Sequence, residues 1–142
     1  MEILGFEYPD DAHFLLEEDI WCRPRADGRV EVGVTAFGIH LSGDVYMCRP
    51  KPVGTELAQG QSVAVAELSK AVVAIRTPVS GLVAEVNPLL ADAPGLVHRE
   101  PYGRGWLVRI EPTRWHEDQA RLAHGESLVA AATARMRLEK LE

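Results

Sequence analysis

The sequence lacks any uninterrupted apolar stretch of the about 18 residues that a membrane-spanning helix needs. It also lacks excess positive charge, because 15 Lys and Arg stand against 21 Asp and Glu, a net charge of −6. That balance disfavours nucleic acid and anionic membrane surfaces as partners. The first residues hold no basic segment followed by an apolar run, so we expect no signal or transit peptide. These absences predict a soluble protein of the cytoplasm.

Cysteine is scarce. Cys22 and Cys48 form no Cys-x-x-Cys pair and have no closely spaced histidine. The pattern favours two free thiols that act as small apolar residues, with a structural disulfide or a redox role as alternatives. The five histidines, at positions 13, 40, 98, 116 and 124, show no spacing typical of a metal site.

The short motifs of common enzyme classes are also missing. The chain has no Gly-x-Ser-x-Gly, no phosphate- or dinucleotide-binding glycine loop and no His-Glu-x-x-His. Its carboxylates are numerous but scattered, so no general acid–base pair can be named. We therefore expect a protein that is not an enzyme.

What is present is typical of one folded domain. The 142 residues are 46% apolar and 25% charged, which suffices for a self-contained core. Val30, Val32 and Val34 alternate with polar or small residues, the period of a strand. Further short runs lie at 45–48, 56–58, 62–67, 71–76, 82–86 and 106–110, separated by Gly and Pro. We expect a mainly β fold, a sandwich or barrel, with an irregular lead-in over 1–19 and a β core over 20–112.

A short helix is expected between two of these strands. Asn87 can cap it and Pro88 fits its first position, so we place it near 88–93. Gly81, which follows the 71–76 strand, is expected to adopt a positive φ. Trp21 and Trp106 are expected to be core or cleft-wall residues.

A second helical segment closes the chain over 113–142. Apolar residues recur every seven positions, at Trp115, Leu122, Val129 and Met136. We expect one helix from 114 to about 140, unless it breaks at Gly125, with this stripe packed on the sheet rather than on a partner. An alternative is that the last dozen residues overhang the domain and mediate self-association.

The most informative segment runs from Gln61 to Gly81. Two β-rich runs flank the tip Glu67-Leu-Ser-Lys70, and the small residues Ser69 and Ala71 leave the approach to Lys70 open. A lysine at such a tip keeps its ε-amine in solvent, and acylation would convert it into a long neutral tether. Taken alone, the tip favours an ordinary exposed lysine.

Segments on both sides of the tip change that interpretation. In chain order they are Val32-Gly-Val-Thr35, Gly43-Asp44, Glu67-Leu-Ser-Lys70-Ala71, Pro78-Val-Ser-Gly81, Val86-Asn87, Pro94-Gly-Leu-Val97 and Pro101-Tyr-Gly-Arg-Gly-Trp-Leu107. In this order and spacing, over roughly residues 20 to 125, the chain resembles the H protein of the glycine cleavage system, a relative of biotinyl and lipoyl carrier domains.

The resemblance implies a barrel-sandwich hybrid that carries lipoate in amide linkage to Lys70. Glu67, Ser69 and Ala71 would form the recognition setting for a lipoate ligase or a lipoyl/octanoyl transferase, with Glu67 as the main contact. A biotin carrier would flank its lysine with methionines, which Ser69 and Ala71 are not.

Departures from the family pattern bear on the cargo. Glycine cleavage H proteins have a His-Glu-Trp motif whose glutamate helps to hold an aminomethyl group, where this chain has Asp19-Ile20-Trp21. An aspartate often follows the lysine by four positions, where this chain has Ala74. A protonated amine needs acceptors that Ile20 and Ala74 do not supply, unless Asp19 or Glu18 compensates.

A further departure lies at Arg49-Pro-Lys-Pro52, which places basic residues where the family has an acidic one. These changes resemble the H-like lipoate-binding proteins of bacterial sulfur oxidation, so we expect a sulfur-carrying protein that serves a heterodisulfide-reductase-like complex. One alternative is the glycine cleavage H protein itself, which serves glycine decarboxylase, aminomethyltransferase and dihydrolipoyl dehydrogenase. Another is an unmodified binding or assembly domain.

Overall fold

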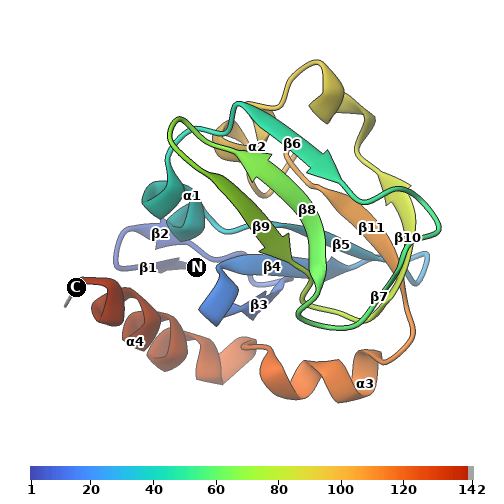
Figure 1. Ribbon diagram of the computed structural model, residues 1–142. Coiled ribbons are helices and arrows are strands. Elements are labelled where there is room, and N and C mark those ends of the chain that lie inside the picture. Colours follow the sequence, from blue (N-terminus) through green and yellow to red (C-terminus); the bar gives the residue numbers. More distant parts are fainter. Residues whose placement is uncertain (141–142) are drawn as a thin grey trace.

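The computed structural model describes residues 1–140 as three antiparallel sheets with helices at their margins (Figure 1). The strands are β1 (Glu2–Ile3), β2 (Phe6–Glu7), β3 (His13–Leu15), β4 (Ile20–Pro24), β5 (Val30–Val34), β6 (Met47–Pro50), β7 (Glu56–Leu57), β8 (Ser62–Glu67), β9 (Val72–Arg76), β10 (Gly81–Val86) and β11 (Val108–Pro112). The α-helices are α1 (Ala36–Ser42), α2 (Leu96–Arg99), α3 (Trp115–Asp118) and α4 (Leu128–Lys140). The 3₁₀ helices are η1 (Leu16–Glu18), η2 (Pro88–Ala91), η3 (Gln119–Arg121) and η4 (Gly125–Ser127). None of the described helices is long and apolar enough to cross a membrane.

The main core lies between two sheets that face each other. One has the strand order β3-β4-β5-β11-β10-β7, and the other has the order β6-β8-β9 and lies across it (Figure 1). Buried side chains from both sheets fill the space between them, among them Val32, Val63, Ile75, Val83 and Ile110. Burial of each such side chain contributes about 1.5–3 kcal/mol. The predicted mainly β fold is confirmed, and β8 and β9 form the expected hairpin.

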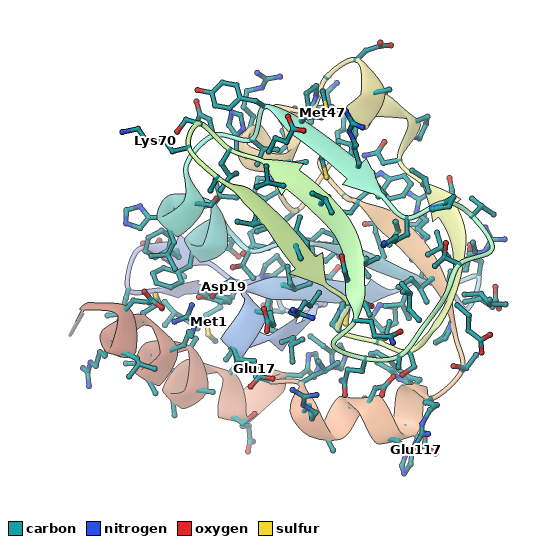
Figure 2. All side chains as sticks on the ribbon, viewed as in Figure 1. Met1, Glu17, Asp19, Met47, Lys70 and Glu117 are labelled. Carbon is teal, nitrogen blue, oxygen red and sulfur yellow. The ribbon has the colours of Figure 1, made fainter. Side chains whose placement is uncertain are left out.

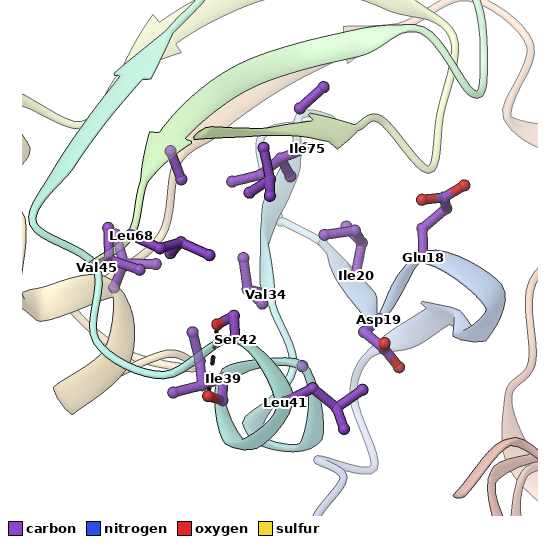
Figure 3. Close-up of a pocket in the computed structure, with 15 residues that line it drawn as sticks. Glu18, Asp19, Ile20, Val34, Ile39, Leu41, Ser42, Val45, Leu68 and Ile75 are labelled. Atoms are coloured by element: carbon purple, nitrogen blue, oxygen red, sulfur yellow. Dashed lines mark hydrogen bonds between the residues drawn. The ribbon is translucent and has the colours of Figure 1, made fainter. Parts of the chain in front are cut away.

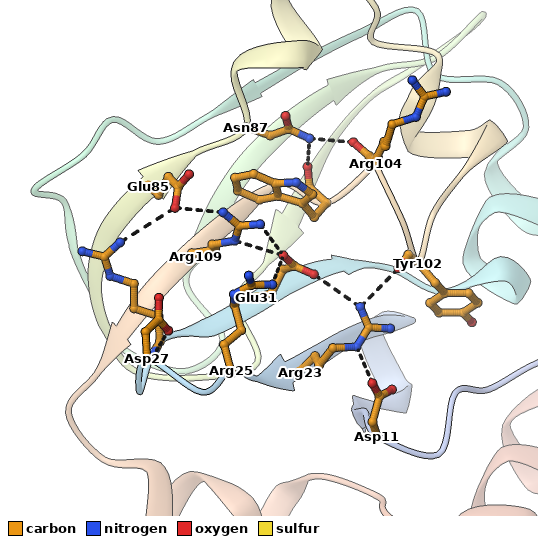
Figure 4. A network of polar contacts seen from close by, with 12 residues as sticks. Asp11, Arg23, Arg25, Asp27, Glu31, Glu85, Asn87, Tyr102, Arg104 and Arg109 are labelled. Carbon is orange, nitrogen blue, oxygen red and sulfur yellow. Dashed lines mark hydrogen bonds and ion pairs between the residues drawn. The ribbon is translucent and has the colours of Figure 1, made fainter.

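The alternation predicted for β5 is confirmed, but Glu31, the charged residue of this strand, is not exposed to solvent. Glu31 is only 4% exposed, because arginines on β4, just after β4 and on β11 cover its carboxylate (Figure 4). Its oxygens accept hydrogen bonds from Arg23 at 3.3 Å, from Arg25 at 3.0 Å and from Arg109 at 3.0 Å. The Arg109 guanidinium also lies over the Trp106 ring, 4.0 Å from its centroid. Charge partners therefore compensate the burial of the carboxylate, as a buried ion requires.

The first 19 residues are more ordered than expected. Leu4 and Gly5 adopt positive φ values of 49° and 89°, which closes a two-residue turn between β1 and β2. Strand β3 then pairs with β4 and forms the edge of the six-stranded sheet. The prediction of an irregular lead-in was wrong, because Ile3, Tyr8 and Phe14 enter a second apolar cluster with the C-terminal helix.

The prediction of one helix over 114–140 was also wrong. The segment is divided into α3, η3, η4 and α4, and the alternative of a break at Gly125, where φ is 66°, is confirmed. In α4 the buried side chains are Leu128, Ala132 and Met136, four residues apart, whereas Val129 is 45% exposed. The four-residue spacing follows the helical repeat, so the seven-residue stripe identified only part of the packed face. Because these three side chains join the second cluster, α4 packs along the domain rather than overhanging it.

The helix expected near 88–93 is present as the shorter 3₁₀ helix η2. Asn87 caps it by accepting a hydrogen bond from the Leu89 N–H at 3.0 Å. Helix α1 was not predicted, although Thr35 caps it in the same way through the Gly38 N–H at 3.0 Å. A cap followed by only seven helical residues gives too weak a periodicity to predict a helix.

The remaining expectations concern Gly81 and the two tryptophans. Gly81 has a φ of 155°, and a Cβ atom there would collide with the Glu111 carbonyl oxygen on β11. Trp21 is fully buried and its indole N–H donates to the Pro101 carbonyl at 2.9 Å. Trp21 and Trp106 both belong to the second apolar cluster, so they are core residues.

Two histidines join the C-terminal segment to the sheet. The ring of His13 on β3 stacks on His124 with a centroid distance of 3.9 Å and meets Trp115 edge-on at 5.0 Å. His124 Nδ1 lies 2.8 Å from the Ala12 carbonyl oxygen, which can only accept, so this nitrogen carries the proton. Burial, and then the neighbouring His124, lower the pKa of His13 to about 4.

We predict that mild acid weakens this junction through His13. Because the folded-state pKa is depressed, the contribution of neutral His13 is complete above its unfolded pKa of about 6.5 and is lost as pH falls through about 4. Discounted for the partial exposure of the ring, the loss should be roughly 1–2 kcal/mol.

Urea denaturation of wild type and His13→Gln between about pH 7 and pH 4 measures this loss. The variant should lose less free energy of unfolding than wild type over that interval. His116→Gln, at an exposed position, is the matched control and should follow wild type. Identical pH dependence in wild type and His13→Gln would contradict the assignment.

Candidate functional site

Lys70 lies at the tip of the β8–β9 hairpin and projects away from the body of the domain (Figure 2). The Leu68 N–H donates to the Ala71 carbonyl at 2.8 Å, so only Ser69 and Lys70 lie outside the backbone pairing. The tip is short because the two strands remain paired up to Glu67 and Val72. The ε-amine is therefore held in solvent by a rigid support.

Glu67, Ser69 and Ala71, the other residues of the predicted recognition setting, lie next to Lys70 along the hairpin. Ser69 and Ala71 are exposed on either side of it, and Glu67 is half-buried at the end of β8. The Glu67 carbonyl accepts a hydrogen bond from the Tyr46 N–H at 2.8 Å, which ties the base of the tip to the segment before β6. All four predicted residues are thus accessible from the same end of the sandwich, and the small side chains leave Lys70 unobstructed.

A cavity of about 290 Å³ opens beside the base of this hairpin (Figure 3). Its volume is near the lower end of the about 300–1,000 Å³ range of ligand sites. The wall is mainly aliphatic and is formed by β4, β5, α1, β8 and β9, with Ile20, Val34, Ile39, Val45, Leu68 and Ile75 as prominent members. Leu68 and Val73 on its wall are two and three residues from Lys70, so a flexible arm of about 10 Å on Lys70 would reach the cavity.

The two positions that depart from the family pattern, Ile20 and Ala74, both line this cavity. Neither offers a hydrogen-bond acceptor from its side chain. Among the described residues that line the cavity, the polar side chains are those of Glu18, Asp19 and Ser42, and the Ser42 hydroxyl already donates to the Gly43 carbonyl at 3.1 Å. The cavity therefore suits an apolar group better than a charged one.

Asp19 belongs to the cavity wall, but its carboxylate is already paired. Its Oδ2 accepts a hydrogen bond at 2.7 Å from Arg135, on the C-terminal helix α4. Burial raises the pKa of Asp19, and the hydrogen bond from Arg135 opposes that rise. Glu18 is exposed at the rim. The sequence did not indicate that Arg135 pairs with Asp19, because the two residues are 116 positions apart.

Helix α1 is the other contributor that sequence reasoning missed. Gly38, Ile39 and Leu41 close one side of the cavity. A Cβ atom on Gly38 would lie 2.8 Å from the Asp19 Cβ, so glycine is what lets the helix approach this wall. The Thr35 cap was the only local signal for this helix.

The basic segment Arg49-Pro-Lys-Pro52 begins on β6, the strand next to β8. The Arg49 guanidinium contacts the Met47 sulfur at 3.0 Å and is exposed, and Lys51 is exposed as well. Two positive charges thus lie on the outer edge of the sheet that carries Lys70.

Comparison with known proteins places this geometry in a family. The family model described as "Glycine cleavage H-protein" matches residues 13–135. The chain belongs to the glycine cleavage H-protein family. Members of this family are carrier proteins rather than catalysts, and they carry a covalently attached lipoate.

Pairwise similarities to individual proteins support this assignment. The chain is 36% identical over 128 residues to glycine cleavage system H protein 3 of Aquifex aeolicus, covering 88% of this chain and 80% of that protein. It is 41% identical over 108 residues to a probable glycine cleavage system H protein of Haloarcula marismortui, covering 76% and 84%. The crystal structure of the glycine cleavage system H protein from Mycobacterium marinum superposes with a TM-score of 0.71 at 31% identity, covering 92% of this chain and 98% of that one. The predicted barrel-sandwich fold is confirmed by this similarity.

The two native thiols are not accessible to solvent. Cys22 and Cys48 are free and buried. Burial raises the pKa of Cys48 to about 12 and raises that of Cys22 as well, which holds both as unreactive thiols.

We predict that a thiol at position 70 is the reactive one in the native protein. Lys70→Cys should react with a colorimetric disulfide reagent in about one equivalent, because its side chain is exposed at the tip and the two native thiols are buried. Wild type should react only after denaturation, which exposes Cys22 and Cys48. More than one reactive thiol in folded Lys70→Cys would contradict the described burial.

Proposed function

We propose that this chain is a lipoyl carrier and that Lys70 is its attachment residue. The observation that carries the proposal is the location of Lys70 in Glu67-Leu-Ser-Lys70-Ala71, at the exposed tip of a two-strand hairpin. The family of the chain supports the choice of lipoate. The neighbouring cavity supports it too, since an aliphatic wall suits the aliphatic end of such an arm.

Each part of the tip has a task in this proposal. The paired strands hold the Lys70 amine clear of the surface, where a lipoate ligase or lipoyl/octanoyl transferase can reach it. Ser69 and Ala71 avoid steric conflict with that enzyme, and Glu67 offers a carboxylate for it to recognise. When bound, lipoate supplies a dithiol–disulfide pair that partner enzymes act on. A cytoplasmic location remains a prediction from the sequence.

The test of attachment is the intact mass of the protein produced in a host with its own lipoylation enzymes. Wild type should gain the mass of one lipoyl group and Lys70→Arg should gain none, because arginine has no acylatable amine of this kind. Lys51→Arg, a control at another exposed lysine, should be modified like wild type. An unmodified wild type, or a modified Lys70→Arg, would refute the proposal.

For the cargo, the first candidate is the aminomethyl group of the glycine cleavage reaction. The relatives' names support it, and with it glycine decarboxylase, aminomethyltransferase and dihydrolipoyl dehydrogenase as partners. A specific observation favours a second candidate. Ile20 and Ala74 leave the cavity without acceptors for a protonated amine, as expected for a sulfur cargo that serves a heterodisulfide-reductase-like complex. An unmodified assembly domain has no such observation in its favour.

An exchange of cavity residues separates the two cargoes. With glycine decarboxylase, the lipoylated wild type should accept the aminomethyl group. The double variant Ile20→Glu/Ala74→Asp should load about tenfold better, because a hydrogen bond to a charged group contributes about 1.5–3 kcal/mol. Ile20→Leu is the matched control for packing and should load like wild type. A wild type that fails to load while the double variant succeeds would reject the first candidate and leave the sulfur cargo.

A further inference from the structure

Asp19 occupies an unusual place in the wall of the cavity beside Lys70. It adopts the left-handed conformation, with φ 57° and ψ 43°, at the junction between η1 and β4. Its carbonyl oxygen accepts a hydrogen bond from the Thr35 N–H at 2.9 Å, just before α1. The backbone of Asp19 is thus fixed, and in Figure 3 its carboxylate points away from Ile20 and Val34.

Arg135 holds that carboxylate from the other side. Its guanidinium donates to Asp19 at 2.7 Å, to the Leu16 carbonyl at 3.0 Å and to Glu139 at 2.6 Å. The side chains of Arg135 and Asp19 are only 15% and 12% exposed. The same guanidinium lies 5.8 Å from the centroid of the Phe37 ring on α1. A planar donor with several partners in fixed directions leaves Asp19 little freedom to turn.

The ion pair with Arg135 compensates the charge that the Asp19 carboxylate would otherwise bring to the cavity. Arg135 does not itself line the cavity, so it neutralises the carboxylate from behind. Glu18 is the other carboxylate at this wall, and it is exposed to solvent, where a charge is strongly screened. The electrical character of the cavity therefore depends on whether Arg135 holds Asp19.

We propose that Arg135 on α4 is a specificity-determining residue, which keeps the cavity beside Lys70 neutral by withholding the Asp19 carboxylate. This inference rests on the proposed function, in which an arm on Lys70 visits the cavity. An arm that ends in an uncharged group is then preferred over one that ends in an ammonium group. Without Arg135, the buried carboxylate needs another cation, and an ammonium at the end of the arm can take that place.

The test uses synthetic arms, so it does not depend on lipoylation. Lys70→Cys protein is treated with 8-aminooctyl or with nonyl methanethiosulfonate, which forms a disulfide at position 70 and releases methanesulfinate. The two arms have the same length and differ only in a terminal ammonium or methyl group. Occupancy of the cavity is measured from the methyl NMR shifts of Ile20 and Ile75, relative to protein treated with methyl methanethiosulfonate.

In the Lys70→Cys background, the nonyl arm should occupy the cavity and the aminooctyl arm should occupy it at least about tenfold less, as for a charge that enters an apolar site. Adding Arg135→Met, which keeps an unbranched apolar stem but removes the guanidinium, should raise occupancy by the aminooctyl arm about tenfold. The triple variant with Asp19→Asn should lose that gain. Arg137→Met, the same substitution at an exposed arginine of α4, is the matched control and should change neither arm.

Two results would overturn the proposal: unchanged aminooctyl occupancy in folded Arg135→Met, or a gain that persists after Asp19→Asn is added. If Arg135→Met does not fold, Asp19→Asn alone decides, because it is nearly isosteric. If Arg135 keeps the Asp19 carboxylate out of the cavity, Asp19→Asn should leave occupancy by the aminooctyl arm within about twofold of the Lys70→Cys parent. If the carboxylate instead binds the ammonium group, Asp19→Asn should lower that occupancy about tenfold. If the wild-type chain is found to carry no lipoate, the proposed function is refuted, but the measured effect of Arg135 on the synthetic arms still holds.

Discussion

The packing of the β6-β8-β9 sheet on the six-stranded sheet is the interaction on which the site depends. The tip at Lys70 has one backbone hydrogen bond of its own, from Leu68 to Ala71, which is too little to fix its position. Its position comes from the strands below it, whose side chains Val63 and Ile75 are buried in the core. The same packing brings β4, β5 and β9 close enough to enclose the cavity. Attachment point and cavity are therefore two results of a single apolar contact between sheets.

Charge is handled differently in the two halves of the molecule. On the outer face of the large sheet, Glu31 is buried beneath three arginines in a network that is distant in sequence from the lysine tip (Figure 4). At the cavity, Arg135 on α4 pairs with Asp19, which lies between η1 and β4. Buried carboxylates cost several kcal/mol unless they are paired, and both are. The second pairing also makes the C-terminal helix part of the site, because α4 supplies the partner.

Much of the fold was predictable because its signals are local. Alternating apolar residues located β5 and the β8–β9 hairpin, and the Asn87 cap located η2. The N-terminal strands were missed because they are only two or three residues long. The C-terminal segment was misread because Val129 fitted a seven-residue stripe but faces solvent, while Ala132, a weakly apolar residue, is fully buried. Periodicity alone does not tell which face of a helix another element will cover.

For the site, the sequence was sufficient to identify the lysine tip. The residues from Glu67 to Ala71 are consecutive, and a hairpin holds consecutive residues together whatever surrounds it. Sequence comparison with the family pattern also identified Ile20 and Ala74 as departures. The three-dimensional structure was needed to show that these two positions share one cavity wall, that α1 closes one side of it, and that Arg135 pairs with Asp19. Those contacts join residues far apart along the chain, and their geometry follows from how sheets and helices pack rather than from any local pattern.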